Sequence, residues 1–392
     1  MPNGLPDPQV GLPLFLYGSL RYEPLLQVVL GPTLDCDIRP AKLTDHADFA
    51  SDGLGSAAVS PAAGSAVDGI LLTDLAADAQ SRLAFYGASL GFSLRPVTVQ
   101  VEGIDIPAQT YWPDVAEAKP GAPWDLQAWR GVWGNLALVT AEEIMTAFGV
   151  LDPRTVAPRL PSIRVRAQAR INARETAPTA LRKRAVPSDV TVQNRITPYA
   201  GFFAIEEYDL THSAFRGGHV DPIERAIFVS GDAATILPYD PNRDRVLLIE
   251  QFRPGAMARG DSQPWLLEAI AGRVDPGETP QQAARREAQE EAGLALTELI
   301  PIGGYYPSPG AMTEYLYSFI GVADLPDHVA GVGGLDTEGE DIRSHVIPFK
   351  KMMDLLQSGE IANASLIVSA LHLARLRDTL RSYRQGPGGR SS

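Results

Sequence analysis

The chain has a single cysteine, Cys36, among its 392 residues. One thiol cannot form a disulfide within the chain, so a small cross-linked secreted scaffold is excluded. Residues 1–13 lack a basic stretch followed by a long apolar core, and no apolar run reaches the length of a membrane span. We therefore expect a cytoplasmic protein that makes no contact with a membrane.

Positive charge is also scarce, with 34 Lys and Arg residues against 47 Asp and Glu residues and a formal net charge of -13. Such a protein binds nucleic acid or an anionic membrane surface poorly unless it has a local basic patch. The arginines gather in residues 151–195, but no aromatic side chain stands between them to stack on bases. We expect no nucleic-acid partner, although a bound divalent cation can still attract an anionic substrate.

Length alone favours more than one domain. Composition divides the chain into a first domain at 1–150, a basic proline-containing linker or docking segment at 151–195, a block of strand-like runs and helices at 196–382, and a Gly/Ser/Arg-rich tail at 383–392. In the first domain we expect strands near 14–17, 67–72, 97–101 and 108–112, helices near 24–30 and 76–86, and a loop over 51–65.

The segment from Gly272 to Leu294 contains the most informative helix. Thr279 and Gln282 have the spacing of a capping box, Pro280 suits a first helical turn, and Gly293 suits a helix end. These signals predict a helix over 280–292. Ala284, Ala288 and Ala292 form a small-residue stripe suited to packing on a sheet.

Three carboxylates share one face of this helix. At 100° per residue, Glu287, Glu290 and Glu291 fall within an arc of roughly 100°. Like charges at this spacing repel, whereas Mg²⁺ prefers carboxylate oxygens and also binds substrate phosphates. The face therefore suits a magnesium–pyrophosphate site, and a merely solvated acidic face is the alternative.

The same residues resemble the Nudix signature. The matching positions are Gly272, Glu278, Arg286, Glu287, Ala288, Glu290, Glu291, Gly293 and Leu294. The resemblance implies an α/β fold for this domain, an α/β/α sandwich with a mixed sheet. It implies Glu287, Glu291 and the Ala271 carbonyl as ligands of Mg²⁺, with Mn²⁺ as a possible substitute. Glu290 would assist, and Arg286 would orient a glutamate by an ion pair.

Flanking residues are similar to the ADP-ribose pyrophosphatase subgroup. Pro309 lies fifteen residues after Leu294, and further similarity runs from the 199–203 segment to the 334–343 segment. The resemblance implies hydrolysis of ADP-ribose to AMP and ribose 5-phosphate. Sugar nucleotides and dinucleotides remain alternative nucleoside diphosphate substrates, and a non-catalytic ADP-ribose sensor is an alternative from another functional class.

The subgroup also implies roles for residues outside the signature. Phe202 would stack on adenine, Arg225 and Arg253 would grip the nucleotide, and Glu338 would activate water with Glu340 as its rival. Phe202 and Arg225 would come from a partner subunit, which implies a homodimer. Ala226 departs from the acidic residue common after the first arginine. Without the resemblance, Phe202 would be a core residue, and Arg253, Glu338 and Glu340 would be solvated.

The first domain resembles the γ-glutamylcyclotransferase-like fold, a small mixed β-barrel. The resemblance rests on Tyr17-Gly18-Ser19-Leu20 after an apolar strand, on Val67 to Leu71 and on Tyr111. Active members carry a glutamate after the helix that ends near Tyr86, but no acidic residue occurs from Gly87 through Val101. Cyclisation needs such a proton-shuttling carboxylate, so we expect a pocket without that activity.

This pairing of domains resembles tellurite-resistance-associated proteins, which names a phenotype and gives no mechanism. A γ-glutamylcyclotransferase with a Nudix appendage is a further alternative, and the missing glutamate argues against it.

Overall fold

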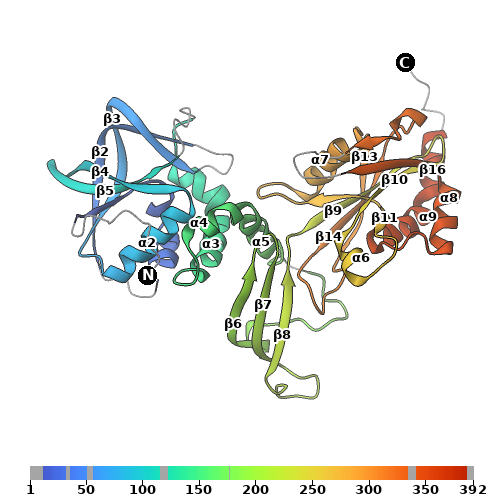
Figure 1. The fold of residues 1–392 in the computed structure, drawn as a ribbon, viewed down its shortest axis with the longest axis horizontal. Coiled ribbons are helices and arrows are strands. Elements are labelled where there is room, and N and C mark those ends of the chain that lie inside the picture. The colour runs from blue at the N-terminus through green and yellow to red at the C-terminus, as the bar shows by residue number, and fades with distance from the viewer. Residues whose placement is uncertain are drawn as a thin grey trace. The chain divides into compact units, whose positions relative to one another are not determined.

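The computed structural model describes residues 12–31, 36–50, 56–114, 122–175, 177–333 and 341–385, with side chains described as far as Ser382. The chain divides into two compact units, Met1–Arg182 and Lys183–Ser392 (Figure 1). Among the described residues, no helix has the length and apolar character needed to cross a membrane.

The first unit contains a closed β-barrel with the strand order β1-β3-β2-β4-β5. Its strands are β1 (Leu14–Leu16), β2 (Asp37–Ala50), β3 (Ala57–Thr73), β4 (Phe92–Val101) and β5 (Ile104–Pro113). β1 pairs parallel with β5, and the remaining pairs are antiparallel. The short strand β1 closes the ring by pairing with β3 on one side and with β5 on the other.

Helices pack against this barrel and against one another. They are η1 (Gly18–Arg21), α1 (Glu23–Leu30), α2 (Ala77–Ser89), α3 (Leu126–Thr146), α4 (Pro153–Val156), η2 (Ala157–Arg159) and α5 (Leu160–Asn172). The shared core includes Phe15, Leu25, Leu83 and Ile144, none of which is exposed. The apolar strands and amphipathic helices predicted from sequence in this unit are therefore present.

Part of the basic segment at 151–195 is helical and docked. Arg166 on α5 is 1% exposed and donates two hydrogen bonds to Glu143 on α3, at 2.9 and 2.5 Å. Arg170 reaches the other oxygen of Glu143 at 3.3 Å. A buried charge needs such partners, so this ion pair fixes how α5 sits on α3.

The second unit begins, after η3 (Pro187–Asp189), with a three-stranded antiparallel sheet of β6 (Val190–Ala200), β7 (Ala204–His212) and β8 (Ile223–Val229). An eight-stranded mixed sheet follows, in which β14 and β9 are parallel. Its strands are β9 (Ala233–Asp240), β10 (Arg245–Phe252), β11 (Trp265–Glu268), β12 (Ile270–Arg273), β13 (Glu298–Tyr305), β14 (Leu316–Val322), β15 (Val332–Gly333) and β16 (Ile342–Pro348).

Helices cover both faces of the mixed sheet, which gives an α/β/α sandwich. Strand residues alternate between the two cores: Leu247 and Ile249 pack with α7 (Pro280–Ala292), whereas Val246 and Leu248 pack with α8 (Phe349–Ser358) and α9 (Ala364–Gln385). This alternation follows from the two-residue period of a strand. The remaining elements are α6 (Pro254–Arg259) and η4 (Asp327–Val329).

Two local expectations were wrong. The loop expected over 51–65 is strand β3 from Ala57 onward, paired with β2 from Ala57–Ala50 to Thr73–Asp37. Small residues suggested a loop, but the ladder with β2 determines this conformation. Without the family resemblance Phe202 was expected in the core, whereas it is exposed and lies in the bend before β7, which begins at Ala204.

Candidate active site

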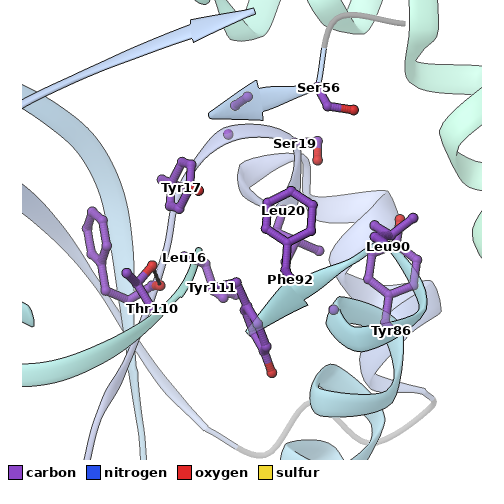
Figure 2. Close-up of a pocket in the computed structure, with 14 residues that line it drawn as sticks. Leu16, Tyr17, Ser19, Leu20, Ser56, Tyr86, Leu90, Phe92, Thr110 and Tyr111 are labelled. Carbon is purple, nitrogen blue, oxygen red and sulfur yellow. Dashed lines mark hydrogen bonds between the residues drawn. The ribbon is translucent and has the colours of Figure 1, made fainter. Parts of the chain in front are cut away.

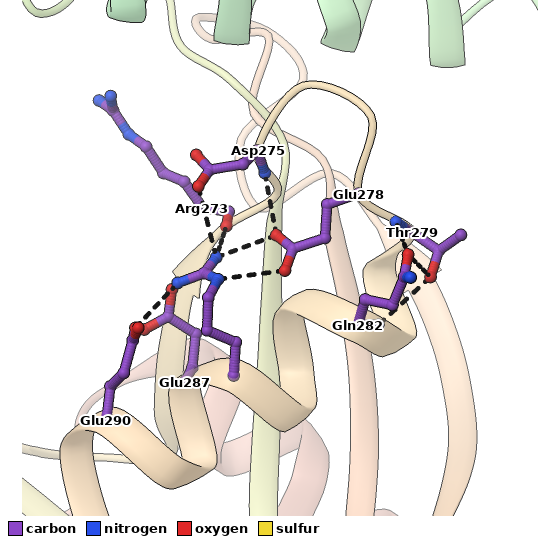
Figure 3. A network of polar contacts seen from close by, with 8 residues as sticks. Arg273, Asp275, Glu278, Thr279, Gln282, Glu287 and Glu290 are labelled. Atoms are coloured by element: carbon purple, nitrogen blue, oxygen red, sulfur yellow. Dashed lines mark hydrogen bonds and ion pairs between the residues drawn. The ribbon is translucent and has the colours of Figure 1, made fainter. Parts of the chain in front are cut away.

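Helix α7 begins and ends where its sequence predicts. The Thr279 hydroxyl accepts from the Gln282 amide at 3.2 Å, and the Gln282 side chain accepts from the Thr279 amide at 2.8 Å (Figure 3). Gly293 ends the helix in the left-handed region at φ 61°. Ala283, Ala284 and Ala288 are fully buried against the sheet, so the small residues bring the helix backbone close to β9 and β12.

The three glutamates of the helix face differ in burial. Glu291 is 4% exposed, and the side chains of Glu287 and Glu290 are 12% and 33% exposed. Carboxylates resist burial unless charged or hydrogen-bonding partners compensate for lost water. Glu291 and Glu287 therefore do not lie on a solvated acidic face.

Gly272 makes room for one of these carboxylates. A Cβ at position 272 would lie 1.8 Å from Oε1 of Glu287 and 1.9 Å from its carboxyl carbon. Any side chain on this strand residue would thus displace the glutamate. The glycine of the signature serves as a cradle for the carboxylate of Glu287.

Arg286 is the centre of the polar network in Figure 3. Its guanidinium donates to both oxygens of Glu278 at 3.1 and 3.0 Å, to Glu287 at 2.6 Å and to Glu290 at 3.0 Å. It also donates to the Arg273 carbonyl at 2.9 Å. Hydrogen bonding to Glu278 is the main reason that the pKa of Arg286 is raised above its ordinary value. Arg286 thus holds Glu287, Glu278 and Glu290 in one network of ion pairs.

The oxygen atoms of this region suit a hard divalent cation. Ala271 lies on β12 opposite Thr235, and Glu287 of α7 lies against the neighbouring Gly272, one helical turn before the buried Glu291. Among the described residues, no group of three or more His, Cys, Asp or Glu side chains could hold a metal ion. Because Mg²⁺ retains several waters, one or two carboxylates with a carbonyl and substrate phosphates are sufficient.

Phe202 and Arg253 are two of the residues that the sequence predicts to bind the substrate. The guanidinium carbon of Arg273 lies 3.6 Å from the centroid of the Phe202 ring, so the bend before β7 meets the signature strand within one chain. Arg253 donates to Glu268 at 2.6 Å, and Asn363 donates to the other oxygen of Glu268 at 2.7 Å. These contacts fix Arg253 at the end of β10.

The remaining predicted residues are less connected. Arg225 on β8 donates to the neighbouring Glu224 carbonyl at 2.7 Å, and among the described residues no contact joins it to the signature. Pro309 is exposed in the connection between β13 and β14. Glu338 and Glu340 lie outside the described residues.

Comparison with known proteins identifies the family. The NUDIX domain model matches residues 229–367. The ADP-ribose pyrophosphatase of Escherichia coli (strain K12) is 39% identical over 182 residues, which are 46% of this chain and 86% of that enzyme. The chain belongs to the Nudix hydrolase family. It is an ADP-ribose pyrophosphatase-like member, and the match lies within its C-terminal half.

Other relatives of this Nudix hydrolase show how far the similarity extends. The ADP-ribose pyrophosphatase of Haemophilus influenzae is 35% identical over 182 residues, 46% of this chain and 83% of that enzyme. The GDP-mannose pyrophosphatase of Salmonella arizonae is 35% identical over 171 residues, 43% and 86% respectively. A crystal structure of an ADP compounds hydrolase, 24% identical with a TM-score of 0.38, covers 53% of this chain and 100% of that one, a similarity too low to add to the assignment.

Sequence reasoning missed two residues beside the Nudix signature. Burial raises the pKa of the Glu314 carboxyl, and the guanidinium groups of Arg273 and Arg253 oppose that rise. Glu314 and Arg273 therefore lie in the same electrostatic environment as Arg253. The position of Arg273 directly after Gly272 is the one sequence signal that could have drawn attention to it.

The barrel unit of this hydrolase has a separate pocket. Its lining includes Tyr17, Ser19, Tyr86, Phe92 and Tyr111, grouped around the turn after β1 (Figure 2). Burial raises the pKa of all three tyrosine hydroxyls, so these phenols stay neutral at physiological pH. Among the described residues, the buried Tyr17 hydroxyl has no hydrogen-bond partner. The predicted Tyr17–Leu20 motif thus lies at a pocket.

Proposed function

We propose that this Nudix hydrolase cleaves ADP-ribose to AMP and ribose 5-phosphate. The supporting observation is the geometry at β12 and α7, where Glu287 lies against Gly272 and is bound by Arg286. Two of the relatives described above are ADP-ribose pyrophosphatases. In the reaction, water adds its oxygen to one phosphorus while the bridging P–O bond breaks, and the released phosphate oxygen takes up a proton.

The proposed metal ligands are the Ala271 carbonyl, Glu287 and Glu291, with Glu290 assisting. Bound Mg²⁺, or Mn²⁺ in its place, would neutralise the pyrophosphate and lower the pKa of a bound water. Arg286 keeps Glu287 turned toward β12 through the 2.6 Å contact. The proposed general base is Glu338, with Glu340 as the competing candidate.

Four residues outside the proposed metal site are proposed to contact the substrate. Phe202 would stack on adenine, and Arg253, held by Glu268, would bind the nucleotide. Pro309 would shape the β13–β14 connection, and Arg225 would act from β8. The resemblance takes Phe202 from a partner subunit, but Phe202 lies beside the Arg273 of its own chain, and we propose that it stacks on the base bound in that chain.

A homodimer is proposed through the three-stranded sheet. Val190, Val192 and Ile196 on β6 are 52%, 49% and 48% exposed, which leaves large apolar side chains along one strand. Exposed apolar residues grouped in this way favour a protein interface. Sedimentation equilibrium should give twice the chain mass, and V192E should shift it toward the monomer, whereas a parent protein of single-chain mass would contradict the proposal.

For the barrel unit we propose a γ-glutamylcyclotransferase-like fold that lacks cyclotransferase activity. The closed five-strand ring and the pocket at Tyr17–Leu20 support this proposal. No acidic residue occurs from Gly87 through Val101, the stretch where active members carry the catalytic glutamate.

A substrate panel tests the main proposal. The full chain with Mg²⁺ should give a higher kcat/KM on ADP-ribose than on GDP-mannose or on a dinucleotide, with E287Q as the inactive control. A higher value on GDP-mannose would favour a sugar-nucleotide hydrolase, because GDP-mannose pyrophosphatases are also among the relatives. Tight ADP-ribose binding without turnover of any substrate would instead indicate a sensor.

A further inference from the structure

Arg273 ends strand β12, and its backbone and its side chain take part in different interactions. Arg273 is the last residue of β12, and its carbonyl accepts from Arg286 at 2.9 Å. Figure 3 shows its guanidinium pointing away from Asp275, Glu278 and Glu287. The backbone of Arg273 is therefore held by the network around Arg286, whereas its side chain points away from those carboxylates.

The guanidinium of Arg273 lies over two neighbouring aromatic rings, those of Phe202 and Phe203. Its carbon lies 3.6 Å from the ring centroid of Phe202 and 5.4 Å from that of Phe203. The first distance is that of close contact between a planar cation and a ring face. Phe203 meets Phe202 edge-on, at 4.8 Å and 89°, and lies 4.6 Å from Phe228 on β8. A cation and a second ring thus fix the orientation of Phe202.

Phe202 nevertheless remains 61% exposed. A large aromatic ring that is anchored on one side and exposed elsewhere presents a rigid flat surface. A planar ligand can stack on such a surface at little cost in conformational entropy, because the ring is already oriented.

Glu314 adds a second link between Arg273 and the substrate region. Its partly buried carboxyl is attracted by both Arg273 and Arg253. The guanidinium of Arg273 thus contacts an aromatic face and is also attracted by an acidic residue. Both interactions favour one position of a long side chain that would otherwise be mobile.

We infer that Arg273 is a positioning residue for nucleobase recognition, which holds Phe202 beside β12 so that the ring receives the purine base of the substrate. The inference rests on the proposed function, because it takes the ligand to be a nucleoside diphosphate. It couples base stacking to the strand that carries Ala271 and Gly272. A base seated on Phe202 is thereby placed at a fixed distance from the proposed pyrophosphate site.

The two hydrolysis products separate base binding from phosphate binding. Calorimetry on the full chain with Mg²⁺ would compare AMP, which has a base, with ribose 5-phosphate, which has none. R273M should weaken AMP binding about 3- to 10-fold, the scale of a lost cation–π contact, and should leave ribose 5-phosphate within about twofold. R273K should lie between parent and R273M, because an ammonium keeps the charge but loses the planar contact.

Two controls make the result specific. R375M removes an exposed arginine on α9 and should leave both affinities unchanged. In an F202L background, R273M should have no further effect on AMP, since the contact acts through Phe202. In kinetics on ADP-ribose, R273M should raise KM by a similar factor while kcat stays near the parent value.

Equal weakening of both products would overturn the inference, because the guanidinium would then bind phosphate. The same loss of AMP affinity in the F202L background would also overturn it, as would a parent protein that does not bind AMP. A parent that binds AMP in the expected pattern but does not hydrolyse ADP-ribose would refute the proposed function and leave the role of Arg273 intact.

Discussion

The carboxylate of Glu287 occupies the space that a side chain at residue 272 would need, with Oε1 1.8 Å from the position of a Cβ. The signature glycine and the first signature glutamate of α7 are thus complementary in shape. Arg286 completes the arrangement by holding the same Oε1 at 2.6 Å. The position of Glu287 depends on a missing side chain as much as on an ion pair.

Replacing this glycine should therefore impair catalysis with little change in the fold. G272A should lower kcat/KM on ADP-ribose by about 100-fold, comparable to the loss when a residue that orients a metal ligand is removed. G131A is the matched control, because a Cβ at 131 would meet nothing within 4 Å. Steady-state kinetics with circular dichroism would check both variants, and near-parent rates for G272A would contradict the cradle.

Replacing Glu291, on the buried side of α7, tests its proposed role as a metal ligand. E291Q removes a charge from a residue that is 4% exposed and should lower kcat by at least about 100-fold while the protein remains folded. E298Q, on an exposed residue of β13, should behave as the parent. Hydrolysis of ADP-ribose by E291Q at the parent rate would remove Glu291 from the site.

Glu338 and Glu340 are separated by kinetics on single variants. E338Q should lower kcat strongly with little change in KM, the pattern of an interaction made in the transition state. E340Q should lower kcat less than E338Q does. Measurements at saturating Mg²⁺ decide between them: the reverse ranking would give the role to Glu340, and near-normal rates in both would assign water activation to the metal and the helix glutamates.

The raised pKa of Glu314 should make the stability of the folded protein depend on pH. Burial raises the pKa of its carboxyl above 4.5, so the folded protein binds this proton more tightly than the unfolded chain does. The stabilisation is fully present below the unfolded pKa and is lost as pH rises through the folded pKa. E314Q should therefore raise Tm relative to the parent more at pH 7 than at pH 4.5, and an equal difference at both pH values would contradict this assignment.

The barrel unit is expected to lack γ-glutamylcyclotransferase activity. Because no acidic residue follows Tyr86 through Val101, the purified chain should release no 5-oxoproline from γ-glutamyl amino acids or glutathione. Chromatographic detection of 5-oxoproline above a buffer blank would overturn the proposal. Y17F is then the variant of choice, because it would show whether the Tyr17 pocket produces the activity.

Local signals predicted α7 to the residue, because Thr279, Gln282 and Gly293 determine its ends through their own hydrogen bonds and backbone angles. The face with Glu287 and Glu291 followed from helical periodicity. Long-range contacts could not be predicted in this way. The contact between Arg273 and Phe202 joins two elements 71 positions apart, and the strand at Ala57 depends on pairing with β2 rather than on its own residues.

The most direct test of the central claim is to identify the products formed from ADP-ribose by the full chain with Mg²⁺. Phosphorus NMR of the reaction should show the pyrophosphate signals replaced by two phosphomonoester signals, those of AMP and ribose 5-phosphate. The same reaction with E287Q should show the substrate unchanged. An intact pyrophosphate after prolonged incubation with the parent chain, or products other than these two, would contradict the account.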